Sequence, residues 1–147
     1  MADPSDLRRF LLAQDARDGA CTIYARALEE LEAGRKRTHW MWFIFPQLDG
    51  LGSSVMAQKY AIGSLAEARD YLAHPVLGPR LRACVQALNG LEGVTARDVM
   101  GFPDDLKLRS SLTLFAQATS DNADFRAALD TYFDGEADPE SMRILGL

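Results

Sequence analysis

The chain has 147 residues, of which 48% are hydrophobic and 25% charged, and its formal net charge is −5. This length and composition are typical of one globular domain and exclude a disordered chain. The negative charge disfavours binding to a nucleic-acid polymer, which requires cations to neutralise its phosphates. We therefore treat residues 1–147 as a single domain.

The cysteines and the N-terminal segment predict the cellular setting. Cys21 and Cys84 form no CxxC pair and no dense framework, which is typical of a reducing compartment. The segment MADPSDLRRF has acidic residues and a proline where a secretory signal would be basic and then apolar. No segment approaches the ~20 apolar residues that span a bilayer. The sequence predicts a cytoplasmic protein that does not contact a membrane.

Apolar residues repeat at intervals of three and four along most of the chain, which predicts helices. Capping residues and glycines mark where these helices begin and end. In chain order the expected helices cover residues 7–14, 24–31, 64–74, 77–90, 95–101, 108–115, 121–135 and 138 onward. Asp104 or Asp105 is the expected N-cap of the helix that contains residues 108–115. No strand pair with a tight Asn-Gly or Asp-Gly turn stands out. The prediction is an all-α fold, a single compact domain of about seven or eight short helices.

Residues 38–47 read THWMWFIFPQ and fit neither a strand nor a surface helix, because they are apolar on every face. The run must therefore be enclosed by the other helices. Its large side chains are typical of a packed core. Exposed faces of Trp40 or Trp42 would instead form a platform on which a planar ring could stack. The sequence leaves open which of these side chains pack and which face a pocket.

Polar residues bracket this run. Three cations, Arg35, Lys36 and Arg37, precede it, and His39 and Gln47 lie near its two ends. The cations would suit the phosphate groups of a ligand whose ring stacks on the run. A solvated loop without a partner is the alternative interpretation.

The segment DGLGSS, residues 49–54, leads into VMAQKYAI and predicts a turn followed by a short helix capped by Ser53 or Ser54. A glycine-containing loop before a helix exposes backbone N–H groups that can bind an anion. The pattern matches neither GxxxxGK[ST] nor GxGxxG. An ordinary capped turn without a ligand is equally consistent with it.

Two lysines farther along the chain, Lys59 and Lys107, lie beside apolar helical stripes. They are either solvated or part of the same site. The two histidines, His39 and His74, lack a spaced carboxylate or cysteine partner, so the sequence predicts no metal site and no cofactor.

Four distinctive segments occur in the order GRKRTHWMWFIFPQLDGLGSS, AQKYAI, SLAEARDYLAHPVLGPRL and DDLKLRSSLTLF. Together they resemble the DUF1810 family of bacterial proteins, which is named as a domain of unknown function. The likeness runs from Leu7 to about Leu145. It implies a predominantly helical single domain and no particular biochemistry.

The chain is also similar, more distantly, to the NADAR domain. The shared order is an aromatic run, a glycine turn, AQK with an aromatic residue, and a lysine-led helix ending in phenylalanine; the matching pieces are residues 42–45, 57–60 and 107–115. NADAR domains are helical and associated with NAD and ADP-ribose metabolism, and some hydrolyse N-glycosidic bonds of ribosylated substrates. They carry a glutamate where this chain has Gly52-Ser53, and a glycine cannot act as an acid or a base. The resemblance implies that another acid, with Asp49 the nearest, takes this role, or that the chain binds without cleaving.

These observations define one candidate site with two sets of residues. Proton transfer or orientation of a water is assigned to His39, Gln47 and Asp49. Ligand binding is assigned to the cations, aromatic residues and turn serine Arg35, Lys36, Arg37, Trp40, Trp42, Phe45, Ser53, Lys59 and Lys107.

Three hypotheses follow for the function. The first is a small-molecule-binding helical domain that acts as a hydrolase on the N-glycosidic bond of a ribosylated, phosphate-bearing metabolite related to NAD or ADP-ribose. The second is a non-catalytic binding or protein-interaction module. The third is a protein whose Trp40 belongs to a surface patch that forms an oligomer contact. The expected partner is a nucleotide-like small molecule, and the oligomeric state is open.

Overall fold

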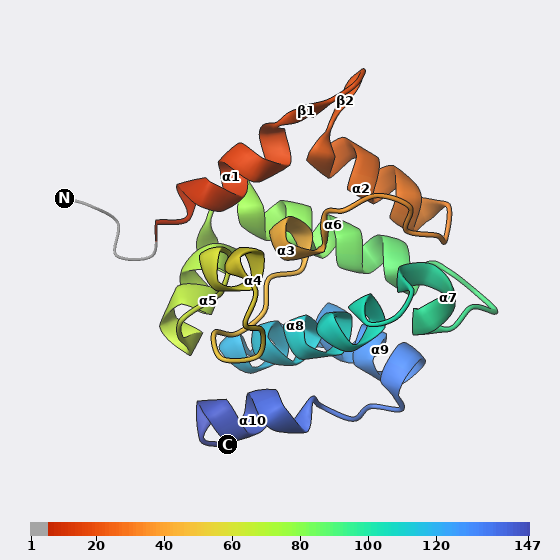
Figure 1. Cartoon of the computed structure of the whole chain (residues 1–147). Coiled ribbons are helices and arrows are strands. Elements are labelled where there is room, and N and C mark those ends of the chain that lie inside the picture. Colours follow the sequence, from red (N-terminus) through yellow and green to blue (C-terminus); the bar gives the residue numbers. More distant parts are fainter. Residues whose placement is uncertain (1–5) are drawn as a thin grey trace.

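The computed structural model describes residues 6–147, and within this range the chain forms ten helices and one very small sheet. The longest helix, α8 (Asp104–Ala118), runs through the middle of the molecule (Figure 1). It contacts α5 (Leu65–Ala73), α7 (Ala96–Met100), α9 (Ala123–Phe133) and α10 (Pro139–Leu145). The predicted all-α fold is confirmed, with seven helices of seven residues or more among those described.

The remaining elements form the other half of the molecule. Helices α2 (Ile23–Glu32) and α6 (Leu77–Asn89) pack against each other, and α6 also contacts α5 and α9. The first helix, α1 (Arg8–Asp15), packs on α2 and on the single turn α3 (Met41–Ile44). The five-residue helix α4 (Val55–Lys59) follows the glycine turn. Within residues 6–147, no helix has both the length and the apolar character needed to cross a bilayer.

Side-chain caps begin several of these helices where the sequence predicts them. The hydroxyl of Ser64 accepts a hydrogen bond from Glu67 N, and Thr95 forms a capping box with Asp98. Asp138 caps α10, with Pro139 at its first position. The predicted cap of α8 is wrong, because Pro103 is the N-cap residue. Both aspartates lie in the first turn, where their negative charge interacts favourably with the helix dipole.

The aromatic run lies at the centre of the molecule, as predicted. Its middle forms α3, and Met41, Phe43 and Ile44 of this turn are buried. Trp40 and Phe45, which flank the turn, are both 1% exposed. Trp42 is the exception, because its side chain is half-buried against the core. The run therefore forms both part of the core and part of a surface.

The expectation of no strand pair is wrong in one place. Residues Arg17–Asp18 (β1) and Cys21–Thr22 (β2) form a two-residue antiparallel ladder that projects beside α2 (Figure 1). Gly19, at φ +70°, follows Asp18 in the connecting turn. The two connecting residues are Gly19 and Ala20, and the flanking strands are too short to show alternation.

Candidate functional site

A groove of about 700 Å³ lies between the N-terminal half of α8, the start of α10 and the turn that precedes α4. Three segments that are far apart in the sequence thus meet at one surface. The side chains and backbone that line the groove are Trp42, Gln47, Leu51, Gly52, Ser53, Ser54, Ala57, Pro103, Leu106, Lys107, Arg109, Ser110, Asp138 and Glu140.

One wall of the groove is apolar and centred on Trp42. The single turn α3 buries its other three side chains, so the indole of Trp42 is left facing the groove. Leu51 and Leu106 also line this region, and Leu106 is 50% exposed. A half-buried indole beside exposed leucine is suited to the face of a planar ligand.

A chain of three charges lies behind this wall. The ammonium of Lys107 is 5.6 Å from the centroid of the Trp42 ring and 3.3 Å from Asp104 Oδ1. The other carboxylate oxygen of Asp104 is 2.9 Å from Lys36 Nζ. Lys36 thus reaches the groove region only through Asp104, and Lys107 is the lysine that lines the groove itself.

The opposite wall carries carboxylates. Asp138 and Glu140 line the groove at the start of α10. Asp138 Oδ2 accepts hydrogen bonds from the backbone N–H and hydroxyl of Ser141, and Glu140 is paired with Arg143. The backbone N–H of Asp138 donates to Thr113 Oγ1 at 2.9 Å, which fixes the start of α10 on α8.

Arg109 holds the segment before α10 in place. Its guanidinium donates to the carbonyl oxygens of Glu136 at 2.9 Å and Ala137 at 3.0 Å. It also lies 3.4 Å from the Glu136 carboxylate. Most of its donors and its charge are therefore engaged by the protein, so Arg109 shapes the groove more than it offers a free cation.

A second polar centre lies at the end of α2, around the buried carboxylate of Glu30. Its Oε1 accepts hydrogen bonds from Arg37 N at 2.7 Å, Thr38 N at 3.0 Å and Trp40 Nε1 at 2.9 Å. Its Oε2 accepts from the Thr38 hydroxyl at 2.8 Å. Burial opposes ionisation, but these hydrogen bonds prevail and hold the pKa of the Glu30 carboxyl below its ordinary value. Glu30 thereby ties the segment before α3 to α2.

The structure divides the predicted site residues among several places. Four of them line the groove: Trp42, Gln47, Ser53 and Lys107. Two are packed in the core, since Trp40 and Phe45 are each 1% exposed. A surface oligomer patch that includes Trp40 is therefore wrong.

The predicted cations do not gather at one site. Arg35 and Arg37 line a separate hollow of about 250 Å³ at the end of α2. Lys36, between them, does not line this hollow and instead pairs with Asp104. Lys59 is exposed, with its ammonium 5.4 Å from the centroid of the Tyr60 ring.

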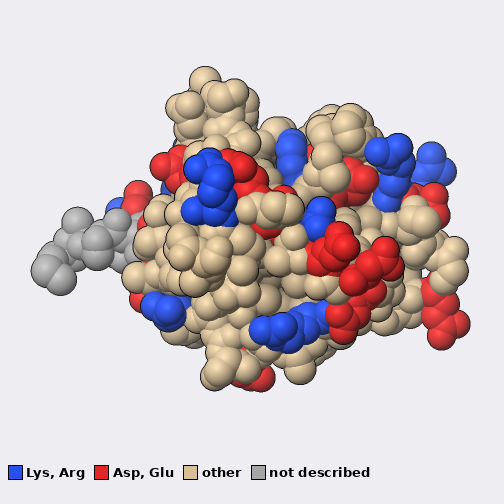
Figure 2. All heavy atoms as spheres, turned by 90° about the horizontal axis from the view of Figure 1, so that it is seen from below, with Lys and Arg blue, Asp and Glu red and all other residues tan. Residues whose placement is uncertain are grey.

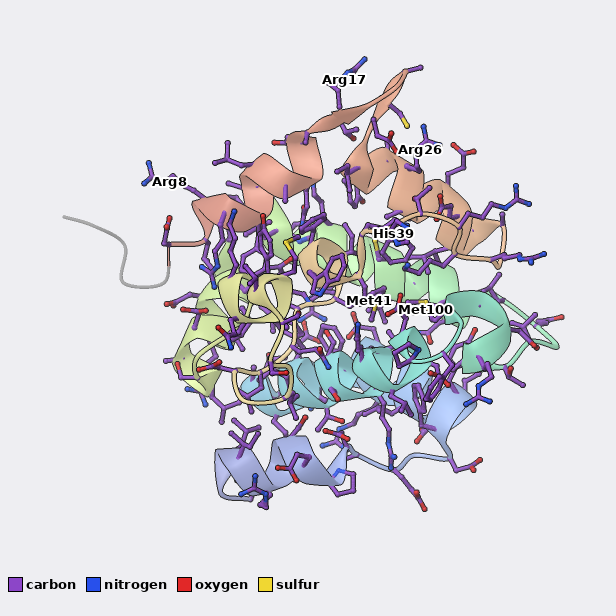
Figure 3. All side chains as sticks on the ribbon, in the orientation of Figure 1. Arg8, Arg17, Arg26, His39, Met41 and Met100 are labelled. Atoms are coloured by element: carbon purple, nitrogen blue, oxygen red, sulfur yellow. The ribbon has the colours of Figure 1, made fainter. Side chains whose placement is uncertain are left out.

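The predicted proton-transfer residues do not meet either. His39 is exposed on the segment between α2 and α3, and Figure 3 shows it apart from α10. Asp49 is exposed, and neither residue lines the groove, whereas Gln47 does. In the part of the chain that the structure describes, no group of three His, Cys, Asp or Glu side chains could hold a metal ion.

Several groove residues were not predicted from the sequence. Leu106 carried one usable signal, an apolar residue on the polar side of a helix. Ser110 reads as a solvated residue but is 6% exposed, and its hydroxyl donates to the Leu106 carbonyl. Asp138 and Glu140 are recognisable only as residues that begin a helix, which carries no information about the surface that this helix covers.

With this geometry established, comparison with known proteins identifies the family. A model described as "Protein of unknown function (DUF1810)" matches residues 4–145. The chain belongs to the DUF1810 family. A solved structure, the conserved hypothetical protein Rv1873 from Mycobacterium tuberculosis, is 50% identical, with a TM-score of 0.93 over 99% of both chains. No match is found among curated proteins. The DUF1810 fold described above is thus shared closely with Rv1873.

Proposed function

We propose that this DUF1810 chain binds a small molecule in the groove, through a planar ring on Trp42 and an anionic group at Lys107. The observation that carries the proposal is the half-buried indole with an ammonium 5.6 Å from its ring centroid, at the edge of a hollow of about 700 Å³. Ligand sites typically have volumes of about 300–1,000 Å³ and combine apolar walls with a few polar groups. Gln47, Ser53 and Ser110 are the polar groups here.

The charge distribution favours a small ligand over a polymer. Figure 2 shows the molecule from the side of α10, and its Lys and Arg side chains form small, separate groups among acidic residues and residues of other kinds. A nucleic-acid polymer would require a continuous basic surface to neutralise many phosphates. A nucleotide-like molecule needs only one cation and one stacking face.

Binding without cleavage is better supported than N-glycosidic hydrolysis. The resemblance to the NADAR domain rests on sequence motifs, and Asp49, the acid nearest to the missing glutamate, does not line the groove. Asp138 and Glu140 do line it, but each already accepts from or pairs with a residue of α10. A general acid or base must reach the reacting bond with its proton-accepting oxygen available. We therefore expect that NAD and ADP-ribose are bound without release of a free base, which chromatography of the incubated mixture would check.

The variant Trp42→Leu tests the proposal. Saturating ADP-ribose or NAD at 100 times Kd is expected to raise the Tm of the wild-type chain by about 5–10 °C. Trp42→Leu keeps an apolar side chain but removes the ring face, so affinity should fall about tenfold, as expected for loss of one stacking contact. Isothermal titration measures the affinity and a thermal melt measures the shift.

Lys59→Ala and Arg37→Ala are the matched controls, because both remove an exposed cation outside the groove. They should bind as the wild type does. An unchanged melting curve with both ligands at millimolar concentration, or equal affinities for wild type and Trp42→Leu, would contradict the proposal.

A further inference from the structure

The three charges behind the groove wall are unequally anchored. Lys36 has 9% of its side chain exposed; its ammonium pairs with Asp104 at 2.9 Å and donates to the Thr38 carbonyl at 2.7 Å. The same ammonium lies 5.1 Å from the centroid of the Trp40 ring. Lys107 has 31% of its side chain exposed and a longer contact of 3.3 Å to Asp104. Lys36 is therefore the fixed partner of Asp104, and Lys107 is the one able to move.

This inequality allows Lys107 to exchange partners. If its ammonium turns from Asp104 to a ligand, Asp104 keeps its ion pair with the nearly buried Lys36. Exchange therefore leaves no partly buried carboxylate without a cation, which would be unfavourable. The ammonium has three donors on a flexible stem, so a small rotation is enough to redirect one of them.

The charges around the groove limit what Lys107 can accept. Two lysines and one aspartate sum to a single positive charge, and one further negative charge neutralises the cluster. The carboxylates of Asp138 and Glu140 also line the groove, and that of Glu140 is paired with Arg143. A second negative charge on the ligand would therefore meet an already neutral cluster and the Asp138 carboxylate, which has only neutral hydrogen-bond donors from Ser141.

We propose that the groove selects a planar ligand whose anionic group carries one negative charge. Asp104 sets this preference because it neutralises the charge of Lys36 and leaves Lys107 able to turn to the ligand. The inference rests on the proposed ligand-binding function and adds the charge class of the ligand. Carboxylates, sulfonates and phosphodiesters are monoanions of this kind, whereas a phosphomonoester carries close to two negative charges at pH 7.5 because its second pKa is about 6.

Three probes with the same ring and sugar separate these charges: adenosine, cyclic AMP and AMP, with zero, one and close to two negative charges at pH 7.5. Isothermal titration of the wild-type chain is expected to show cyclic AMP as the tightest of the three, by roughly fivefold. In Asp104→Asn the cluster carries two positive charges, so the ratio of AMP to cyclic AMP affinity should rise roughly fivefold. Because this ratio is compared between variants, differences in probe shape cancel.

Asp121→Asn is the matched control, since it removes the same charge from a side chain that is 90% exposed beyond the far end of α8. It should leave the ratio unchanged. Lys107→Met provides a second variant if Asp104→Asn folds poorly, and it should abolish the preference for cyclic AMP over adenosine.

The outcomes distinguish the two proposals. The charge inference is overturned, while ligand binding stands, if AMP binds the wild type more tightly than cyclic AMP. It is also overturned if Asp104→Asn leaves the ratio of AMP to cyclic AMP affinity unchanged and Lys107→Met leaves the ratio of cyclic AMP to adenosine affinity unchanged. If none of the three probes binds wild type or variants at millimolar concentration, the inference fails together with the proposed function.

Discussion

Replacing Glu30 with alanine is expected to lower the free energy of unfolding by about 3 kcal/mol, corresponding to a fall in Tm of roughly 6–12 °C at this chain length. The carboxylate accepts from two backbone N–H groups, one indole N–H and one hydroxyl; the indole contact is buried and the other three are partly buried. Alanine leaves them without an acceptor, and each buried unsatisfied donor costs free energy. Urea unfolding followed by circular dichroism measures the loss.

Glu30→Gln separates the charge from the hydrogen bonds. The amide oxygen can take the place of Oε1, which accepts from Arg37, Thr38 and Trp40, so most bonds persist in a weaker, neutral form. We expect a loss of about 1–2 kcal/mol. Glu29→Ala, an exposed neighbour on the same helix, should change stability by less than about 0.5 kcal/mol. Equal stabilities for Glu30→Ala and Glu29→Ala would contradict this role for the buried carboxylate.

The same residue predicts a dependence of stability on pH. The pKa of Glu30 is lowered from its ordinary 4.5 by its hydrogen bonds, so the unfolded chain binds its proton more readily than the folded chain. Its contribution is fully present above pH 4.5 and is lost as pH falls through the lower pKa of the folded state. Subtracting the stability of Glu30→Gln from that of wild type, pH by pH, should show this acid loss, and a flat difference would contradict it.

The helices were predictable because their signals are local. Ser64, Thr95 and Asp138 each accept a hydrogen bond from a backbone N–H three residues later, so cap and partner lie within one turn of sequence. The cap of α8 was mispredicted for a related reason. Two adjacent aspartates offer the same cap signal at either position, and Pro103 precedes both of them.

The groove was predictable only in part, because it joins segments that are far apart in the chain. Trp42 and Lys107 were both predicted site residues, but their proximity depends on how α3 and α8 pack. The acidic wall comes from the start of α10, and no pattern near Asp138 indicates which surface this helix covers. The direction of the Lys36 side chain was equally unpredictable, because it pairs with Asp104 of α8 while its two arginine neighbours line a separate hollow.

The aromatic run shows why one residue type can serve two purposes. Trp40 and Trp42 are two positions apart, yet Trp40 is 1% exposed and donates to Glu30, while Trp42 lines the groove. An apolar pattern on every face predicts enclosure but does not distinguish these two environments. The distinction comes from α3, whose single turn leaves one of its four side chains facing outward.

Gly78→Ala is the second variant for which we expect a large effect, a loss of about 3 kcal/mol in the free energy of unfolding. Gly78 is the second residue of α6 and is buried against the end of α5. A methyl group at this position would lie 2.1 Å from the carbonyl oxygen of Leu72 and 2.9 Å from its carbonyl carbon. These are backbone atoms, so no side-chain rotation relieves the clash, and the α5–α6 turn must open.

Gly63→Ala is the matched control, because a methyl group there meets no atom within 4 Å. Fewer conformations of the unfolded chain should make this variant as stable as wild type or more stable by up to about 1 kcal/mol. In thermal melts, the Tm of Gly78→Ala should therefore lie at least about 6 °C below that of Gly63→Ala. A Gly78→Ala protein with the same Tm as wild type would contradict this prediction. It would show that α5 and α6 can move apart without loss of stability, so that the close approach of Leu72 does not determine it.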